Sequence, residues 1–398
     1  SSGTSSASAS TDSTASKSSE KAVIVTDEQD FTHENGITRL AKEIYGDLNV
    51  EFFVLSEDTQ ERETQISSLR VEIMAGGGPD GYLLSSPTSN MTFNGEGHPA
   101  TLFPDVQRTM QAGAFLPLDD YIKESEYLRS EDHFAPVFDT GKTDEGQVVL
   151  PITYYASVFL LDKAQLADPD FTPKTWDELV NCEDTAVLKV VRNNLYTWCG
   201  AGIPRIADYT TEKTILTEEN LTAQFEDLLA MPASESFDEE TALIQSGSYA
   251  QTDEGMAYYA QNKDTVNAFA IPNTEGGVTA FITSYAAINR NSPKADEVFR
   301  FFELLFSDEA QIDTETVNDA RGTLLMLGNL NSFLTHKNAY LQPELLESVQ
   351  SRVNAVRFYS VMDYTIYDTA TTLTWEENPD CAAAAHSVIE ALQTRLSE

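Results

Sequence analysis

The sequence contains few cysteines and no long apolar run. Among its 398 residues only Cys182, Cys199 and Cys381 are cysteines, and their spacing fits neither a CxxC pair nor a metal site. A disulfide between Cys182 and Cys199 is compatible with this spacing. No stretch reaches the roughly 18 consecutive apolar residues that a membrane-spanning helix needs. These absences exclude a cysteine-rich scaffold and a membrane-spanning helix within this sequence.

Basic residues are also scarce. Lysine and arginine total 25 against 64 aspartates and glutamates, which gives a formal net charge of -39. Such a surface repels nucleic-acid phosphates and anionic lipids, so we expect neither as a partner. Because the acidic residues are spread along the chain, their main expected effect is solubility. Attraction of a cationic ligand is the alternative that this charge leaves open.

Signatures of catalysis and of metal binding are absent from the sequence. It has no GxSxG, HExxH or P-loop motif, and no GxGxxG that follows a strand. The carboxylates are too numerous for any pair of them to indicate a glycosidase. The histidines have no pair at metal-binding spacing; they are His33, His98, His133, His336 and His386. We therefore expect a protein without enzymatic activity, cofactor or bound metal.

Three short apolar runs follow one another at the start of the chain, at residues 22–26, 50–55 and 80–84. They recur roughly every 30 residues, which is the length of a β–α–β unit. Runs that are apolar on both faces are typical of strands covered by helices on both sides. A helix between the second and third runs is expected to end at Gly76–Gly78, and Pro79 prevents its continuation. The pattern predicts an α/β lobe with a parallel sheet.

The rest of the chain continues this alternation. Gln147–Asp162 is a long, mostly apolar run that is expected to be extended. Thr175 and Glu178 have the spacing of a capping box at a helix start. Further strands are expected at residues 266–272 and 278–289, and further helices start at Ser292 and Asn378.

Six segments of the chain carry a recognisable sequence pattern. They are residues 75–80 (AGGGPD), 114–121 (AFLPLDDY), 146–154, 174–179 (KTWDEL), 292–311 and 374–398. Taken together and in this order, they resemble the extracellular solute-binding proteins of family 1, the group that includes maltose-binding protein. Two regions depart from the family pattern: Arg321–Leu324 lacks the usual proline, and residues 188–260 match poorly.

The resemblance implies an α/β fold of the periplasmic-binding-protein type II, in which two α/β lobes are joined by crossover hinge segments. Lobe 1 would comprise residues 21–153 and 279–325, and lobe 2 residues 154–278 and 326–398. The crossovers would lie near residues 152–155, 271–279 and 320–330.

The resemblance also implies a function. The chain would be the extracellular receptor of an ABC importer, a monomer that captures a sugar or oligosaccharide and delivers it to the permease subunits. Residues 1–20 are rich in serine and threonine and almost free of apolar side chains, so we expect a disordered tether. The tether would link the protein to a lipid anchor at the bacterial cell surface. The same fold binding a polyamine or peptide is one alternative, and a secreted enzyme or adhesin is another.

Candidate ligand contacts follow from the expected fold. Open α/β sheets bind ligands at the carboxyl ends of their strands. Aromatic rings cover the apolar faces of sugars, and polar side chains bond their hydroxyls. Nine residues meet these conditions: Glu28, Asp30, Asp58, Tyr154, Tyr155, Trp198, Tyr285, Arg321 and Trp375. Trp198 is the expected stacking platform. Only one of Tyr154 and Tyr155 is expected to reach the ligand, because adjacent strand residues point to opposite faces.

Overall fold

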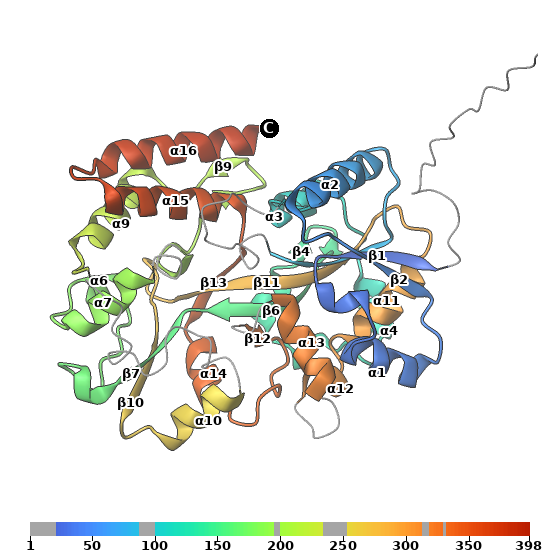
Figure 1. The fold of residues 1–398 in the computed structure, drawn as a ribbon, viewed down its shortest axis with the longest axis horizontal. Helices are drawn as coiled ribbons and strands as arrows, with labels where there is room; N and C mark the ends of the chain where they lie inside the picture. Colours follow the sequence, from blue (N-terminus) through green and yellow to red (C-terminus); the bar gives the residue numbers. More distant parts are fainter. Residues whose placement is uncertain (1–20, 87–99, 195–199, 234–252, 313–317, 329–331) are drawn as a thin grey trace, which may run out of the picture.

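The computed structural model describes residues 21–86, 100–194, 200–233, 253–312, 318–328 and 332–398 (Figure 1). These residues form two groups of helices and strands, and each group surrounds a hydrophobic core of its own. We call these the first core and the second core. Within the ranges described, no helix is both long and apolar enough to cross a bilayer.

The first core is built on a seven-stranded mixed sheet. Its main path runs β12 (Phe333–Leu334), β6 (Leu150–Ala156), β11 (Val278–Ile288), β3 (Gly81–Ser85), β1 (Ala22–Thr26) and β2 (Val50–Val54), and β13 (Val353–Phe358) pairs with β11. Strand β1 is parallel to β2 and β3, whereas β11 is antiparallel to β3 and β6. Because β3, β6 and β11 are buried along their whole length, their sequences are apolar at most positions. The three apolar runs predicted at the start of the chain form β1, β2 and β3.

Helices surround this sheet (Figure 1). They are α1 (Gly36–Tyr45), α2 (Thr59–Met74), α3 (Val106–Gln111), α4 (Asp119–Glu124), α5 (Ala135–Asp139), α10 (Asp253–Gln261), α11 (Ala295–Leu304), α12 (Asp308–Gln311), α13 (Asn318–Gly328) and α14 (Glu344–Gln350). Helix α1 starts with a capping box, since the Asn35 side chain accepts from the Thr38 amide at 3.0 Å and the Thr38 hydroxyl accepts from the Asn35 amide at 2.9 Å. Helix α2 ends next to Gly76, whose φ of 86° stops the helix as predicted.

The second core is mainly helical. It contains α6 (Trp176–Val180), α7 (Thr185–Asn193), α9 (Glu218–Ala230), α15 (Val361–Trp375) and α16 (Cys381–Ser397), and short strands β8 (Ala207–Asp208) and β9 (Lys213–Thr214) pair beside it. Helix α6 begins after Thr175 as predicted, and the Thr175 hydroxyl accepts from the Glu178 amide at 3.1 Å. The Glu178 carboxylate accepts from the amide of Lys174 at 2.8 Å, one residue earlier than a capping box requires.

A two-stranded ribbon lies between the two cores. Strands β7 (Val158–Asp162) and β10 (Val266–Ala270) pair antiparallel. Successive side chains of β7 join different cores: Val158 and Leu160 belong to the first, and Phe159 and Leu161 to the second. This double burial explains why the run Gln147–Asp162 reads as apolar at most positions.

The last third of the chain is shared between the two cores. Helix α13 packs in the first core, where Leu324 and Leu327 are both buried, so the predicted lobe division at residues 325 and 326 falls inside this helix. The pairing of β12 with β6 keeps the chain there, and α14 then contacts β10 and α10. By core membership, the chain leaves the first core after Phe358 and enters the second at Met362.

Candidate functional site

A buried carboxylate follows strand β1 directly. The side chain of Asp27 is 4% exposed. Its oxygens accept from the Ser85 amide at 3.1 Å and from the Ser85 hydroxyl at 2.7 Å, and the Arg62 guanidinium lies 3.8 Å away. Burial raises the pKa of the Asp27 carboxyl above its usual value, and the Ser85 and Arg62 donors offset part of that rise. The carboxyl ends of the parallel strands β1 and β3 therefore share one polar centre.

Sequence reasoning missed Asp27 and chose its neighbours. Glu28 is half-buried and caps a short 3-10 helix by accepting from the Asp30 amide at 3.0 Å. Burial raises the pKa of the Glu28 carboxyl, and the nearby charges of Asp27, Asp30 and Glu57 act in the same direction. The position of Asp27, immediately after a buried strand, was the available signal for it.

The other two predicted acids near these strand ends bond within the protein. Asp30 accepts from the Thr323 hydroxyl of α13 at 3.2 Å and lies 3.3 Å from the His33 ring. Asp58 is exposed and caps α2, since its carboxylate accepts from the Glu61 amide at 2.8 Å. Helix capping thus accounts for the position of Asp58.

A series of buried hydroxyl groups crosses the sheet near the carboxyl end of β3. The Thr153 hydroxyl lies 2.8 Å from that of Thr283 and 2.5 Å from that of Ser284. The Thr283 hydroxyl is also 2.7 Å from that of Ser332, which donates to the Gly328 carbonyl at 2.8 Å. Polar residues inside the apolar strands β6 and β11 were a signal that the sequence analysis did not use.

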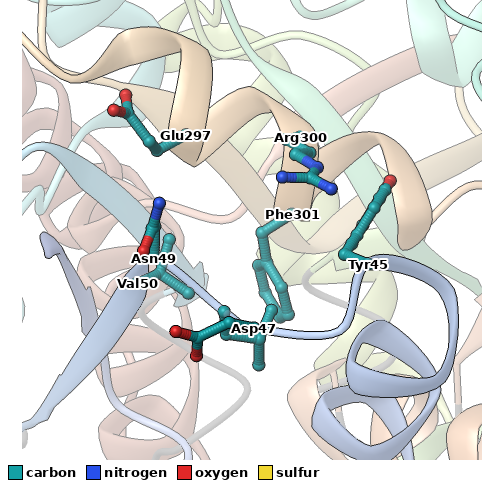
Figure 2. Close-up of a pocket in the computed structure, with 8 residues that line it drawn as sticks. Tyr45, Asp47, Asn49, Val50, Glu297, Arg300 and Phe301 are labelled. Carbon is teal, nitrogen blue, oxygen red and sulfur yellow. The ribbon is translucent and has the colours of Figure 1, made fainter.

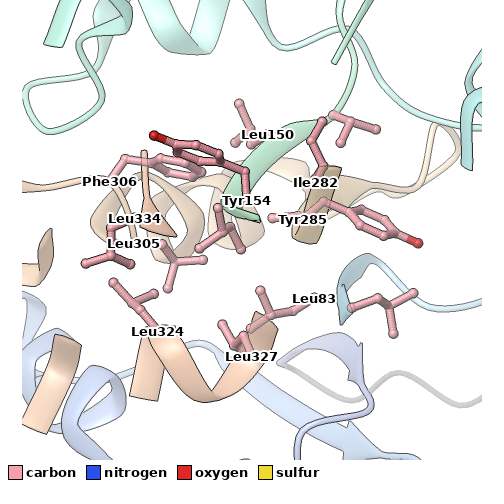
Figure 3. Close-up of a cluster of buried hydrophobic side chains, with 14 of the residues drawn as sticks. Leu83, Leu150, Tyr154, Ile282, Tyr285, Leu305, Phe306, Leu324, Leu327 and Leu334 are labelled. Atoms are coloured by element: carbon pink, nitrogen blue, oxygen red, sulfur yellow. The ribbon is translucent and has the colours of Figure 1, made fainter. Parts of the chain in front are cut away.

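Two predicted tyrosines, Tyr154 and Tyr285, lie in the first core (Figure 3). Both are at most 1% exposed. The Tyr154 hydroxyl accepts from the Gln350 amide group at 2.7 Å, and the Tyr285 ring makes an edge contact with Phe358 at 5.7 Å between centroids. As in Figure 3, both rings lie among aliphatic side chains of the core.

Tyr155 points the opposite way from Tyr154 and joins a small aromatic cluster with Phe281 and Tyr359. The rings of Phe281 and Tyr359 stack at 4.4 Å with an interplanar angle of 10°. The cluster brings together the ends of β6 and β13 and the first half of β11. Of the two adjacent tyrosines, Tyr155 is the one that lies outside the two large cores.

The remaining predicted residues are spread over the molecule. Arg321 of α13 is 7% exposed, and its guanidinium lies 4.5 Å above the ring of Tyr340. Trp375 is the last residue of α15 and is 82% exposed. Trp198 and Cys199 lie outside the described residues, so the predicted stacking platform and the Cys182–Cys199 pair remain predictions.

A buried ion pair stands where β13 meets the second core. The Arg357 guanidinium pairs with the Asp363 carboxylate, and both side chains are less than 10% exposed. The same guanidinium donates to the carbonyl oxygens of Gly200 at 3.4 Å and Ile203 at 3.2 Å, and it lies 4.7 Å above the ring of Phe281. Sequence reasoning missed this pair, whose partners come from separate elements.

A second polar contact joins the two groups of elements through α3. Asp105, the N-cap of α3, faces the Tyr209 hydroxyl, and burial raises the pKa of its carboxyl to about 6. Next to it, the Arg108 guanidinium donates to the Arg395 carbonyl of α16 at 2.6 Å. These contacts place polar groups from both cores opposite one another.

Three potential metal ligands, Asp132, Asp308 and His336, lie together in the first group. Arg129 already lies between the carboxylates, with its Nε 2.8 Å from Asp132 and an Nη 3.5 Å from Asp308. The Nδ1 of His336 accepts from the Asn338 amide at 3.0 Å, so the proton of a neutral ring is on Nε2, which faces Asp308 at 3.2 Å. An ion-pair network with Arg129 accounts for this cluster better than a metal does.

A small cavity of about 20 Å³ lies between the α1–β2 turn and α11 (Figure 2). Tyr45, Asp47, Glu297 and Arg300 are among the residues that line it, and the Arg300 guanidinium lies 4.1 Å above the Tyr45 ring. This volume holds about one water molecule, so the cavity is too small for a solute.

Hydrogen-bonding groups gather at the carboxyl ends of strands of the first sheet. They are hydroxyls, carboxylates and guanidinium groups that bond one another, with an aromatic cluster beside them.

The chain matches a family of known proteins over most of its length. Residues 36–312 match the family model described as bacterial extracellular solute-binding protein. No curated protein matches the sequence. Among solved structures, the sugar-binding protein MalE from Xanthomonas citri has a TM-score of 0.61 at 10% sequence identity, with 95% of this chain and 97% of that chain covered.

Two further structures are similar over nearly the whole chain. An extracellular solute-binding protein of family 1 from Alicyclobacillus acidocaldarius has a TM-score of 0.55 at 11% identity, covering 96% of this chain and 100% of that one. The protein Lmo0181 from Listeria monocytogenes, in complex with cycloalternan, has a TM-score of 0.54 at 12% identity, covering 95% and 98%. At such low identity the structures show the fold alone, and they confirm the predicted two-lobed α/β architecture.

Proposed function

Because the chain belongs to the bacterial extracellular solute-binding protein family, we propose that it captures a sugar or oligosaccharide between its two lobes. The family match over residues 36–312 is the observation that carries the solute-binding role, and the carbohydrate class rests on the structural neighbours. We also propose that the loaded protein delivers its solute to the permease of an ABC importer. The protein would act outside the cell, held near the membrane by a lipid-anchored N-terminal tether.

The side chains at the strand ends support a ligand rich in hydroxyl groups. Asp27, Arg62 and Ser85 offer charged and neutral hydrogen-bonding groups at the carboxyl ends of β1 and β3. Hydrogen bonds to charged groups are the stronger kind, and a site built on them rejects ligands that lack the matching hydroxyl.

The structural neighbours support the same ligand class. MalE is a sugar-binding protein, and Lmo0181 was solved with cycloalternan. A third neighbour, from Arthrobacter globiformis, binds cyclic alpha-maltosyl-1,6-maltose and has a TM-score of 0.53. All three are described by a carbohydrate, and no single sugar is common to them, so the neighbours favour the class rather than one sugar.

A cationic ligand is the second candidate. Asp27, Glu28, Asp30 and Glu57 gather after β1 and β2, and their mutual repulsion contributes to the raised pKa of Glu28. A polyamine would neutralise several of these charges at once. The net charge of -39 would also speed its encounter with the protein at low salt.

A thermal-shift screen separates these candidates. A ligand that binds only the folded state stabilises it by about 2.7 kcal/mol at one hundred times its Kd. We expect a concentration-dependent rise in Tm with maltotriose, mannotriose or cycloalternan, and none with spermidine or a tripeptide. A rise with spermidine and with no carbohydrate would refute the proposed ligand class. Sugar recovered unchanged after incubation would separate binding from an enzymatic reaction.

A further inference from the structure

Arg357 lies where the large sheet passes into the second core. It belongs to β13, which pairs with the first half of β11, and its side chain extends to α15 and to residues 200–203. Ala201 and Ile203 are buried in the second core, so this side chain joins elements of both cores. Its guanidinium therefore connects parts of the protein that any change in lobe arrangement must move relative to one another.

The surroundings of this side chain require a planar cation with several N–H donors. Asp363 neutralises the charge, the carbonyl oxygens of Gly200 and Ile203 accept from the opposite nitrogen, and Phe281 covers one face of the guanidinium. Only arginine offers a fixed fork of donors that can serve all these partners at once. The Arg357 side chain is 8% exposed, so removing one of its charged or hydrogen-bonding partners would leave a buried charge unpaired and would destabilise the fold.

The second chain crossing, at residues 271–277, is tied to the same segment of the second core. The Thr274 amide donates to the Gly202 carbonyl at 3.2 Å. The Asn273 side chain donates to the Asn354 side chain of β13 at 2.8 Å, and a Cβ at Gly277 would overlap Asn354. Residues 200–203 are thus held from two sides, by Arg357 of β13 and by the crossing that carries Thr274.

Close packing limits how this region can rearrange. A Cβ at Gly200 would lie 3.1 Å from the Phe281 ring, so a larger residue there would require the ring to shift by a few tenths of an ångström. The carbonyl of Gly200 is one of those that Arg357 holds. Backbone, ring stack and guanidinium therefore form one tightly packed unit.

We propose that Arg357 is a positioning residue that fixes the arrangement of the two lobes by holding residues 200–203 against the second crossing. This proposal builds on the proposed function, in which a solute binds between the lobes. A loosened hinge populates more open arrangements, and the apparent affinity for a solute falls by the fraction of the binding-competent state that is lost.

The test compares hydrogen exchange in three variants of the ligand-free protein. Arg357→Met keeps the apolar stem and removes every donor, whereas Arg357→Lys keeps the charge but lacks the fork. Arg192→Met is the control, because Arg192 is a half-buried arginine whose bond to the Leu228 carbonyl at 3.1 Å stays within the second core. The lysine variant carries the test by itself if the methionine variant does not fold.

We expect exchange in peptides covering residues 271–279 to become at least tenfold faster in Arg357→Met and by a smaller factor in Arg357→Lys. Peptides covering β1 and β2 should exchange as in the wild type, because local opening leaves the first core intact. Small-angle scattering should show a larger radius of gyration for the Arg357 variants than for the control. Unchanged exchange at 271–279, or an equal increase in every segment or in Arg192→Met, would overturn the proposal. No ligand is used, so failure here leaves the proposed carbohydrate class untouched.

Discussion

Acidification should destabilise this protein through the buried histidine His133. The side chain is 1% exposed, its Nδ1 lies 3.0 Å from the Thr335 hydroxyl, and its ring is flanked by Phe138 and Phe306. Burial lowers the pKa of His133 to about 3, and the neighbouring His336, Lys337 and Arg129 also disfavour its charged form.

The direction of this pH effect follows from the number of protons that the folded and the unfolded state bind. An unfolded histidine titrates near pH 6.5, so between about pH 3 and 6.5 the unfolded chain binds a proton that the folded His133 does not. The contribution to stability is therefore complete above pH 6.5 and is lost as the pH falls. With these pKa values, the loss between pH 7 and pH 5 is about 2 kcal/mol.

The assay is urea unfolding of the wild type and of His133→Phe at pH 5, 6 and 7. The phenylalanine keeps a ring between Phe138 and Phe306 and removes the titration. Titrating carboxylates, including Asp105, are common to both proteins, so the difference between the two pH profiles isolates His133. We expect the variant to lose about 2 kcal/mol less than the wild type between pH 7 and pH 5.

His386 serves as a control, because the opposite dependence of stability on pH is expected for it. His386 on α16 is exposed, and its hydrogen bond to Glu218 raises its pKa. Its small contribution is present at low pH and is lost as the pH rises, so His386→Gln should change the profile in the opposite direction. Parallel profiles for the wild type and His133→Phe would refute the argument that a buried neutral His133 sets this pH dependence.

Three further predictions concern packing and binding. Gly328→Ala should lower the unfolding free energy by about 1–3 kcal/mol in urea, because its Cβ would overlap the Thr153 hydroxyl; full retention of stability would show that α13 can shift. Tyr154→Phe should cost about 1 kcal/mol through loss of the bond from Gln350, and a neutral result would mean that water replaces that bond. Trp198→Ala should weaken carbohydrate binding at least tenfold by calorimetry with Tm nearly unchanged, and a collapse of Tm would make Trp198 a core residue.

The strands of the first core were predictable from their apolar runs. Strands β1 and β3 are buried at nearly every position, whereas the edge strand β2 exposes Glu51 and Phe53. Residues 22–26, 50–55 and 80–84 are apolar runs separated by a helix with a glycine stop, and they became parallel neighbours. The helix start at Thr175 was also predictable, because it depends on one local hydrogen bond, from the amide three residues later to the Thr175 hydroxyl.

The candidate site was less accessible because its partners are distant in sequence. The position of Asp27 after β1 marks it as a candidate, but its partners Ser85 on β3 and Arg62 on α2 meet it only once these elements pack together. The side-chain directions of Tyr154 and Tyr155 were predictable only in part. Strand geometry predicts that the two side chains point to opposite faces, but packing decides which of them enters the first core.

The sequence by itself determined the local starts and ends of helices, since these depend on periodicity and caps. Its short motifs carried the resemblance that implied the family and the two-lobed α/β class. Only the tertiary structure decided which side chains share a site. Arg357 meets Asp363, Gly200 and Phe281 because β13, α15 and β11 converge at the boundary of the two cores. Contacts between residues far apart in the chain depend on how whole elements pack, and packing leaves no local pattern in the residues that it brings together.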